Sequence, residues 1–378
     1  MRPVIASLTV AGVALAAAVG VGATEARAQQ ASGEPIPVGL IANLTGTDVA
    51  SSLSMTRGVE MAVEEINAGG GVEGRPLELI TEDSEYRSQE ALNAATKLYE
   101  VDGVEAAIMF GGSSLMIPVA ELAQQKGKVL INTSSSAPKL GEFPGTLFSV
   151  LPLDDIMGLE LGTWVAAQGA KTAAFVVPNN TFGTGLMEAA AEAFEDKGGE
   201  VVRKIAYTEG QPDYRADVQT LVQADPDAII AAGYGDDSRA VFKNARQVGL
   251  EAPWYAAYPT IFSIEDEAWM SGRLLGVDNA GSSLPSAQAV REAYTKQYGE
   301  EPSPHVYYGY DAAMILARAM EQGGTNADAI KTALPLAIAN YEGATGKIRW
   351  DDHGQRIDPP IEFVKYQDGK FEVLEARN

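Results

Sequence analysis

The sequence predicts an α/β protein of two doubly wound lobes, each a parallel sheet between layers of helices. Strand-like and helix-like segments alternate along almost the whole chain, which is typical of parallel sheets flanked by helices. The pattern occurs twice, and 378 residues are too many for one ordinary core. No low-complexity linker separates the halves, which favours lobes joined by short strands.

In the first half, apolar runs and residues at helical spacing predict alternating elements. Met55, Val59 and Val63 recur on one helical face, for example, and so predict a core-facing helix. The predicted strands are 36–42, 77–81, 106–110 and 129–132, and the predicted helices are 55–67, 89–101 and 117–125.

The second half repeats this scheme. The predicted strands are 172–177, 200–206, 228–232 and 254–257, and the predicted helices are 185–197, 214–222, 238–248 and 307–322.

The N-terminus has the pattern of a Sec-type export signal. Arg2 is the only charge before Glu25, and the uncharged run between them is rich in Ala, Val and Gly. Ala26-Arg27-Ala28 matches the small-x-small cleavage pattern, so we expect a signal peptide over 1–28, cleaved after Ala28, rather than a membrane anchor. The expected location is the periplasm.

Composition narrows the function. The chain has no cysteine, which excludes disulfides, thiolate catalysis, cysteine-bound metals and a lipid-modified cysteine. His305 and His353 are its only histidines, and no catalytic motif occurs, so we expect a non-enzymatic protein without metal or cofactor. The formal net charge of −23 disfavours nucleic acid and anionic membranes as partners.

One glycine motif resembles a nucleotide site but has the wrong context. Residues 69–74 match G-x-G-x-x-G, whose glycines must follow a strand and open a helix to meet a pyrophosphate. Here they follow a predicted helix and precede a predicted strand. We therefore interpret them as a helix C-cap and turn.

Two loops at strand ends predict an anion site. Residues 110–114 (FGGSS) and 132–138 (NTSSSAP) each follow a strand and carry small hydroxyl side chains. Ligands of open parallel sheets bind at the carboxyl ends of strands, and helix N-termini there favour anions. Because neither loop contains Lys or Arg, a carboxylate is the expected ligand group. The alternative is that Ser113 and the serines of 134–136 only cap helices.

In the order and spacing of its short sequence motifs, the chain resembles the periplasmic solute-binding proteins of ATP-driven (ABC) importers, in the leucine/isoleucine/valine-binding family. The resemblance covers nearly all of the mature chain. Its markers are Thr45-Gly46, Gly58, Glu64 to Asn67, Gly70 to Arg75, Ser113-Ser114 with Pro118, Ala137-Pro138, Phe182-Gly183, Ala245-Arg246 with Gly249-Leu250, Tyr310 to Ala313, and Gly346 with Trp350 to Gly354.

The resemblance implies a clamp of the periplasmic binding protein type I fold, whose lobes close on a ligand about crossing hinge strands. The crossings would lie near 149–152, 275–280 and 346–351. Lobe 1 would then comprise 34–150 plus 279–348, and lobe 2 would comprise 151–278 plus 349–378. The implied chain is a monomer that transiently contacts an ABC permease in the inner membrane.

The resemblance also implies ligand-binding positions. Ser113 and the loop containing Ser134 and Ser136 would hold a ligand carboxylate, Phe182 and Tyr234 would wall its side chain from the second lobe, and Ser51 and His305 would complete the pocket. For Phe182 the alternative is ordinary core packing.

One position departs from the family pattern. Amino acid binders of this family use a second-lobe acid to pair with the ligand ammonium, and here that position is Tyr258. Asp236 or Asp237 would then supply the charge, unless they only cap the following helix. If they cap it, an aromatic or aliphatic carboxylate without an amine fits, walled in part by Tyr258.

The sequence thus favours a transport protein that binds a branched-chain or other apolar amino acid. The alternatives are a binder of amine-free carboxylates, a sensory partner that presents its ligand to a membrane receptor, and an exported enzyme using carboxylates such as Asp236 and Asp237.

Overall fold

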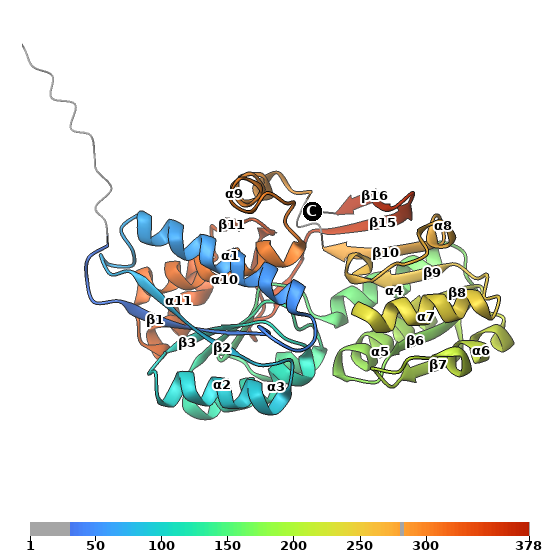
Figure 1. Cartoon of the computed structure of the whole chain (residues 1–378), viewed down its shortest axis with the longest axis horizontal. Coiled ribbons are helices and arrows are strands. Elements are labelled where there is room, and N and C mark those ends of the chain that lie inside the picture. Colours follow the sequence, from blue (N-terminus) through green and yellow to red (C-terminus); the bar gives the residue numbers. More distant parts are fainter. Residues whose placement is uncertain (1–30, 280–282, 378) are drawn as a thin grey trace, which may run out of the picture.

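A computed structural model describes residues 31–279 and 283–377 as two α/β lobes lying side by side (Figure 1). The predicted signal peptide, 1–28, lies outside the described residues. Within them, no helix is both long and apolar enough to cross a membrane.

The first lobe is a parallel sheet covered by helices on both faces. Its strand order is β2-β1-β3-β4-β5, and every neighbouring pair is parallel. The strands are β1 (Ile36–Ala42), β2 (Leu77–Asp83), β3 (Ala106–Met109), β4 (Val129–Asn132) and β5 (Leu147–Ser149).

Apolar side chains alternate between the two faces of this sheet. One face packs on α1 (Val49–Ala68), α10 (Pro304–Gly323) and α11 (Ala327–Ala337). The other packs on α2 (Ser88–Glu100) and α3 (Ser113–Lys126), as Figure 1 shows.

The second lobe repeats this plan with two added edge strands. Its order is β16-β15-β10-β9-β8-β6-β7. In the described part of this sheet, the β10–β15 and β15–β16 pairs are antiparallel and the other neighbouring pairs are parallel. The strands are β6 (Thr172–Pro178), β7 (Glu200–Tyr207), β8 (Ala228–Ala231), β9 (Trp254–Ala257), β10 (Leu274–Asn279), β15 (Ile361–Gln367) and β16 (Lys370–Arg377).

Helices again cover both faces. One face packs on α4 (Asp154–Ala167) and α5 (Thr181–Asp196). The other packs on α6 (Arg215–Ala224), α7 (Gly235–Gln247) and α8 (Glu267–Met270).

Short elements complete the chain. They are η1 (Pro138–Glu142), η2 (Pro259–Ile261), η3 (Pro285–Ala287), α9 (Gln288–Tyr298), β11 (Glu342–Gly343), β12 (Gly346–Lys347), β13 (Arg349–Trp350) and β14 (Arg356–Ile357).

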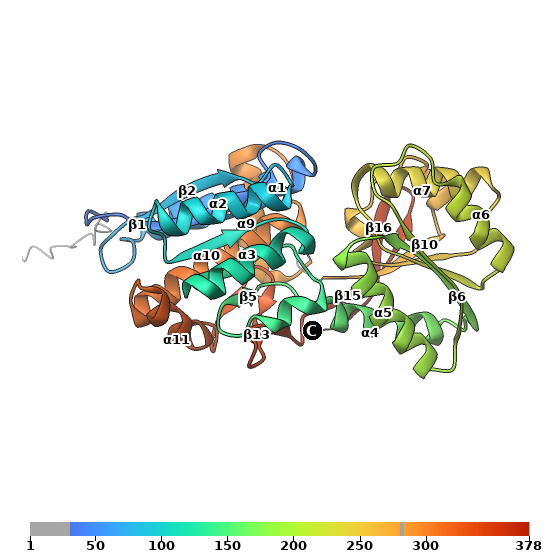
Figure 2. The same cartoon turned by 90° about the horizontal axis from the view of Figure 1, so that it is seen from below.

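The chain passes between the lobes after β5, after β10, and between β14 and β15 (Figure 2). The β13–β14 hairpin contacts the first lobe, since Trp350 Nε1 donates to the Ser149 carbonyl at 2.7 Å. The chain enters the second sheet only at Ile361, so the predicted lobe boundary at 349 falls within this hairpin.

A buried arginine joins these crossings. Arg356 is 2 % exposed and donates to the Val150 carbonyl at 2.6 Å, to Thr345 Oγ1 at 3.0 Å and to the Thr345 carbonyl at 2.6 Å. Thr345 Oγ1 in turn donates to the buried carboxylate of Asp311 at 2.6 Å. Such hydrogen-bonded burial is what allows a charge to lie in a protein interior.

The glycine motif is a turn, as predicted. Gly69 caps the C-terminus of α1, and Gly70, Gly71 and Gly74 all have positive φ, which glycine adopts without a Cβ clash. A bridge between Val72 and Arg75 closes this turn before β2 begins.

Candidate functional site

A cavity of about 570 Å³ lies between the lobes. Eight of the nine predicted site residues line it. The first lobe contributes Ser51, Ser113, Ser134, Ser136 and His305, and the second contributes Phe182, Tyr234 and Tyr258. A cavity of this size suits a small-molecule ligand.

Helix α3 points its N-terminus at this cavity. The helix begins at Ser113, four residues before the predicted start, so Gly112 is its N-cap and the Ser113 and Ser114 amides lie in its first turn. First-turn amides have no intrahelical acceptor and carry the positive end of the helix dipole. Ser113 Oγ accepts from the Ala137 amide at 3.1 Å and so ties the two predicted loops together.

Pro118, inside α3, leaves the Ser114 carbonyl without its intrahelical N–H donor. Ser88 Oγ donates to that carbonyl instead, at 3.2 Å. The helix end at the cavity is therefore braced by α2.

The serines of the second loop brace the site. Ser134 Oγ accepts from the Gly111 amide at 2.8 Å and donates to the Gly111 carbonyl at 2.9 Å, while Ser135 Oγ donates to the same carbonyl at 2.6 Å. Ser136 Oγ donates to Asp154 Oδ2 at 3.0 Å, across the first crossing between the lobes. These hydroxyls fix the positions of the loops relative to each other. Their oxygens keep lone pairs that can accept hydrogen bonds from a ligand.

Aromatic rings form the wall from the second lobe. The Phe182 ring centroid lies 6.1 Å from that of Tyr234 and 6.4 Å from that of Tyr258. Tyr258 follows β9 with φ 54°, a left-handed conformation that is strained for a bulky residue and marks functional sites. These rings and the N-terminal end of α3 line the same cavity.

His305 is neutral where it meets the cavity. Its ring stands edge-on to Phe110 at 5.2 Å, and burial lowers its pKa to about 4. Its buried Nδ1 atom has no hydrogen-bond partner among the described residues.

The structure corrects the prediction that Asp236 belongs to this site. It does not line the cavity, because its carboxylate points outward from the first turn of α7 and pairs with Arg239 at 3.0 Å. Asp237 instead accepts from the Gly210 amide at 3.0 Å and from Tyr214 at 2.5 Å. Neither residue lines the cavity.

Sequence reasoning missed several lining residues. They are chiefly Asp48, Tyr86, Asn180, Glu209, Asp278 and Tyr308. Asp48 and Tyr86 share positive φ with Tyr258, and no residue pattern in a single sequence reveals such strain at non-glycine positions.

A polar network forms one side of the cavity in the second lobe. Tyr234 donates to Glu209 Oε1 at 2.6 Å, and Asn180 Nδ2 donates to Glu209 Oε2 at 2.8 Å and to the Tyr234 hydroxyl at 3.0 Å. The Tyr86 hydroxyl of the first lobe interacts with that of Tyr234, so tyrosines meet across the cleft. Burial raises the pKa of Tyr86 to about 12, which keeps this hydroxyl protonated.

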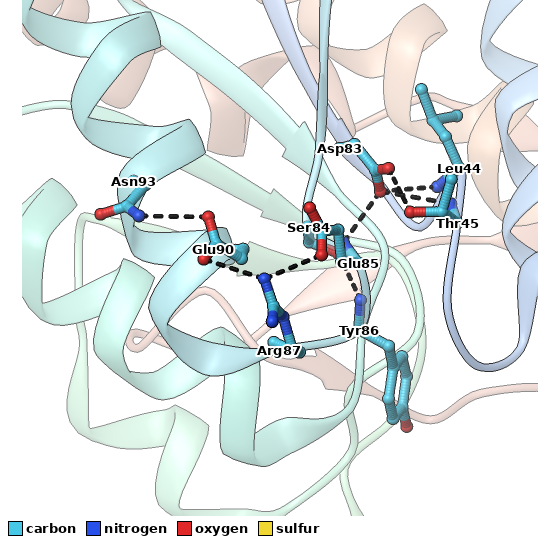
Figure 3. A network of polar contacts seen from close by, with 9 residues as sticks. All are labelled: Leu44, Thr45, Asp83, Ser84, Glu85, Tyr86, Arg87, Glu90 and Asn93. Atoms are coloured by element: carbon cyan, nitrogen blue, oxygen red, sulfur yellow. Dashed lines mark hydrogen bonds and ion pairs between the residues drawn. The ribbon is translucent and has the colours of Figure 1, made fainter.

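A second network orients Tyr86 (Figure 3). Asp83, at the end of β2, accepts from Thr45 Oγ1 at 2.6 Å and from the Leu44 and Glu85 amides at 2.9 and 2.8 Å. Desolvation works against ionisation of this carboxyl, but these hydrogen bonds prevail and lower its pKa. Asp83 thereby fixes the loops that carry Asp48 and Tyr86.

Two lobes joined by several crossings around a ligand-sized cavity define the class of hinged, two-lobed binding proteins. The sequence profile described as "Periplasmic binding protein" matches residues 35–370, and the chain belongs to this family.

Individual relatives agree with this assignment. A leucine-, isoleucine-, valine-, threonine- and alanine-binding protein of Pseudomonas aeruginosa is 27 % identical over 341 residues, covering 88 % of this chain and 90 % of the relative. The crystal structure of a leucine-binding protein from Thermotoga maritima is 25 % identical, with a TM-score of 0.83 over 91 % of this chain and 99 % of its own.

A solute-binding protein of an ABC transporter from R. palustris, solved with benzoate, shares the fold. Its TM-score is 0.80 over 91 % of this chain and 96 % of its own, at 20 % identity.

Proposed function

We propose that this chain is an extracytoplasmic solute-binding protein that captures a small carboxylate-bearing ligand by closure of its lobes and delivers it to an ABC importer. The observation that carries the proposal is the N-terminus of α3, whose Ser113 and Ser114 amides open into a cavity lined by both lobes. Amides at a helix N-terminus bind a carboxylate without a basic side chain.

The ligand we favour is a branched-chain or other apolar amino acid. The Phe182, Tyr234 and Tyr258 rings offer an apolar wall for its side chain. The Pseudomonas aeruginosa and Thermotoga maritima relatives, described as binding leucine or a set of small amino acids, support this choice.

The second candidate is an aromatic or aliphatic carboxylate without an amine. Tyr258 favours it, because a phenol stands where we expected an acid to pair with an ammonium. The benzoate-bound relative supports it only through the shared fold.

The expected setting follows from the N-terminal sequence. Removal of residues 1–28 after Ala28 would release a monomer into the periplasm, where its partner is an ABC permease of the inner membrane. Its role there is binding rather than turnover of the ligand.

A thermal-shift panel on the mature, ligand-stripped protein tests the proposal. Each amino acid is compared with its amine-free acid, for example leucine with 4-methylpentanoate and phenylalanine with 3-phenylpropionate, alongside benzoate. A ligand at a hundred times its Kd stabilises the protein by about 2.7 kcal/mol, which raises the midpoint by several degrees. A panel in which no carboxylate raises the midpoint contradicts the proposal.

A further inference from the structure

Three strand-end loops of the second lobe are tied together at the mouth of the cavity. Asn180 follows β6 as the N-cap of α5, Glu209 follows β7, and Tyr234 follows β8. The Glu209 carboxylate accepts from the Tyr234 hydroxyl at 2.6 Å and from Asn180 Nδ2 at 2.8 Å. Asn180 Oδ1 accepts from the Gly183 amide at 2.9 Å, which fixes this network to the backbone of α5. Since Glu209 is exposed and Tyr234 is half-buried, the network lies at the rim of the cavity rather than at its base.

The Tyr234 oxygen keeps one acceptor position. A hydroxyl has one proton and two lone pairs. The proton of Tyr234 goes to Glu209, and one lone pair accepts from Asn180 Nδ2 at 3.0 Å. The second lone pair is left for the Tyr86 hydroxyl of the first lobe, which interacts with that of Tyr234. Because donation to a carboxylate polarises the Tyr234 hydroxyl, its oxygen becomes a better acceptor.

The first lobe holds Tyr86 in an unusual backbone conformation. Glu85 and Tyr86 have φ angles of 50° and 54°, left-handed values that cost free energy in residues other than glycine. The Glu85 amide donates to Asp83 at 2.8 Å, and the Tyr86 amide donates to Ser84 Oγ at 3.4 Å. The Tyr86 ring projects away from the Asp83 network (Figure 3). A methyl group on Gly112, the N-cap of α3, would lie 2.8 Å from the Tyr86 hydroxyl, so this hydroxyl lies against the end of that helix.

The contact between the tyrosines lies far from two of the crossings between the lobes. Tyr86 follows β2, the edge of the first sheet opposite β5, and the chain first crosses after β5. The order β2-β1-β3-β4-β5 puts four strand spacings between these edges, roughly 19 Å at about 4.8 Å each. The hairpin that leads to the third crossing contacts β5 through Ser149. A small rotation of the lobes about that edge therefore separates the two hydroxyls, which makes their contact specific to the closed arrangement.

A second contact between the lobes is weaker. Ser114 Oγ of α3 donates to Thr181 Oγ1 of α5 at 3.4 Å, beyond the range of about 2.5–3.0 Å typical of O–H···O bonds. The tyrosine contact has a polarised acceptor and a fixed partner network, so we expect it to contribute more to closure.

We propose that Tyr86 and Tyr234 form a latch, in which the Tyr86 hydroxyl donates to the Tyr234 oxygen and holds the lobes in the closed arrangement. Glu209 strengthens the latch by accepting the Tyr234 proton. The latch acts between lobe and lobe, so it favours closure on every ligand that the closed cavity admits. The inference rests on the closure that we propose for this binding protein, and its test uses no ligand.

Distances between two spin labels on the ligand-stripped mature protein test the latch. The chain has no cysteine, so Glu121→Cys in α3 and Gln219→Cys in α6 introduce the only labelling sites. Both positions are exposed, and they lie in different lobes. Pulsed electron spin resonance then gives the populations of a shorter, closed distance and a longer, open one. The labelled pair is placed in wild type, Tyr86→Phe, Tyr234→Phe, the double variant and Tyr310→Phe.

We expect Tyr86→Phe to lower the closed-to-open ratio about fivefold, since it removes one hydrogen bond of ordinary net strength. Tyr234→Phe should lower the ratio as much, and the double variant no further, because both single variants break the same bond. Tyr310→Phe is the matched control and should keep the wild-type ratio. It removes a hydroxyl that bonds Glu65 at 2.7 Å within the first lobe, and Tyr310 does not line the cavity.

Three results overturn the inference. One is a Tyr86→Phe protein with the wild-type ratio, and another is a double variant whose losses add, which would mean that the hydroxyls act separately. The third is wild-type protein that shows only the open distance. If Tyr86→Phe does not fold, Tyr234→Phe decides, and an unchanged ratio in that variant overturns the latch. These results leave the proposed function standing, because the thermal-shift panel tests that function separately.

Discussion

The two sides of the cavity offer a ligand different chemical groups. The first lobe presents main-chain amides at the start of α3, braced by serine hydroxyls that bond to other backbone groups. The second lobe and the hinge present aromatic rings and buried carboxyls. Backbone amides can hold any carboxylate, so discrimination among carboxylates must come from the second lobe and the hinge. The sharpest tests separate these two roles.

The largest effect should come from the helix end of the first lobe. Ser113→Pro removes the first amide of α3 at a position where proline is well tolerated, so the helix should persist. Loss of a hydrogen bond to a charged group costs about 1.5–3 kcal/mol, so calorimetry should show a 10- to 100-fold weaker Kd for every carboxylate. Ser113→Ala, which loses only the hydroxyl, should change Kd less. An equal loss for both variants would mean that the amide does not bind ligand.

The hinge side of the cavity should contribute a pH dependence of its own. Burial raises the pKa of Asp278 to about 6 from an ordinary 3.8, so the folded protein favours its protonated form. The stabilisation that protonated Asp278 gives the folded state is complete at pH values below the pKa of this group in the unfolded chain. It is lost as the pH rises through about 6.

An asparagine side chain cannot ionise at this position. The stability of Asp278→Asn relative to wild type should therefore increase between pH 4 and pH 7, by at most about 3 kcal/mol. Urea unfolding without ligand at both pH values measures this difference. A difference that is the same at both would show that Asp278 is not perturbed by burial.

A substitution in the part of the cavity that would hold the ligand side chain should change the selectivity between amino acids. His305→Phe replaces a neutral ring whose buried Nδ1 has no partner among the described residues with an apolar ring that can keep the edge contact to Phe110. Leucine affinity should stay or rise a few-fold, while threonine affinity should fall by comparison. A leucine-to-threonine ratio that does not change would place His305 outside the ligand's reach.

The smallest effect should come from the bracing serines. Ser134→Ala removes both hydrogen bonds to Gly111, which are worth about 1 kcal/mol each in net stability. The thermal midpoint should fall by a few degrees, and Kd should weaken equally for amino acids and amine-free acids. A change in selectivity would instead indicate direct contact between Ser134 and the ligand.

Some elements could be predicted from local pattern and others could not. β1, β4 and β9 match their predicted bounds, because short apolar runs between turn residues permit little else. Helix α4 was missed, because apolar residues lie on several of its sides and its packing on α5 and the sheet hides the helical period. β15 and β16 were missed because they form an antiparallel edge on an otherwise parallel sheet.

The candidate site divides in the same way. Residues of strand-end loops, such as Ser113 and Tyr234, could be predicted because parallel sheets place those loops at one edge. Asp236 was wrong because only the rotation of α7 about its axis decides whether its first turn faces the cavity or solvent. Asp278 lay in a segment interpreted as a crossing strand, and nothing local shows that it faces the cavity.

The sequence alone determined the alternation of strands and helices, the family, and the two serine-bearing loops at the strand ends, because each depends on residues close together in the chain. Only the tertiary structure decided which acids line the cavity. Asp278 lines the cavity because β10 pairs with β9 and with β15, and its cross-strand partner on β15, Glu362, lies far along the chain from it. The position of Asp278 in the cavity is thus set by strand pairing over long separations, which no local pattern encodes.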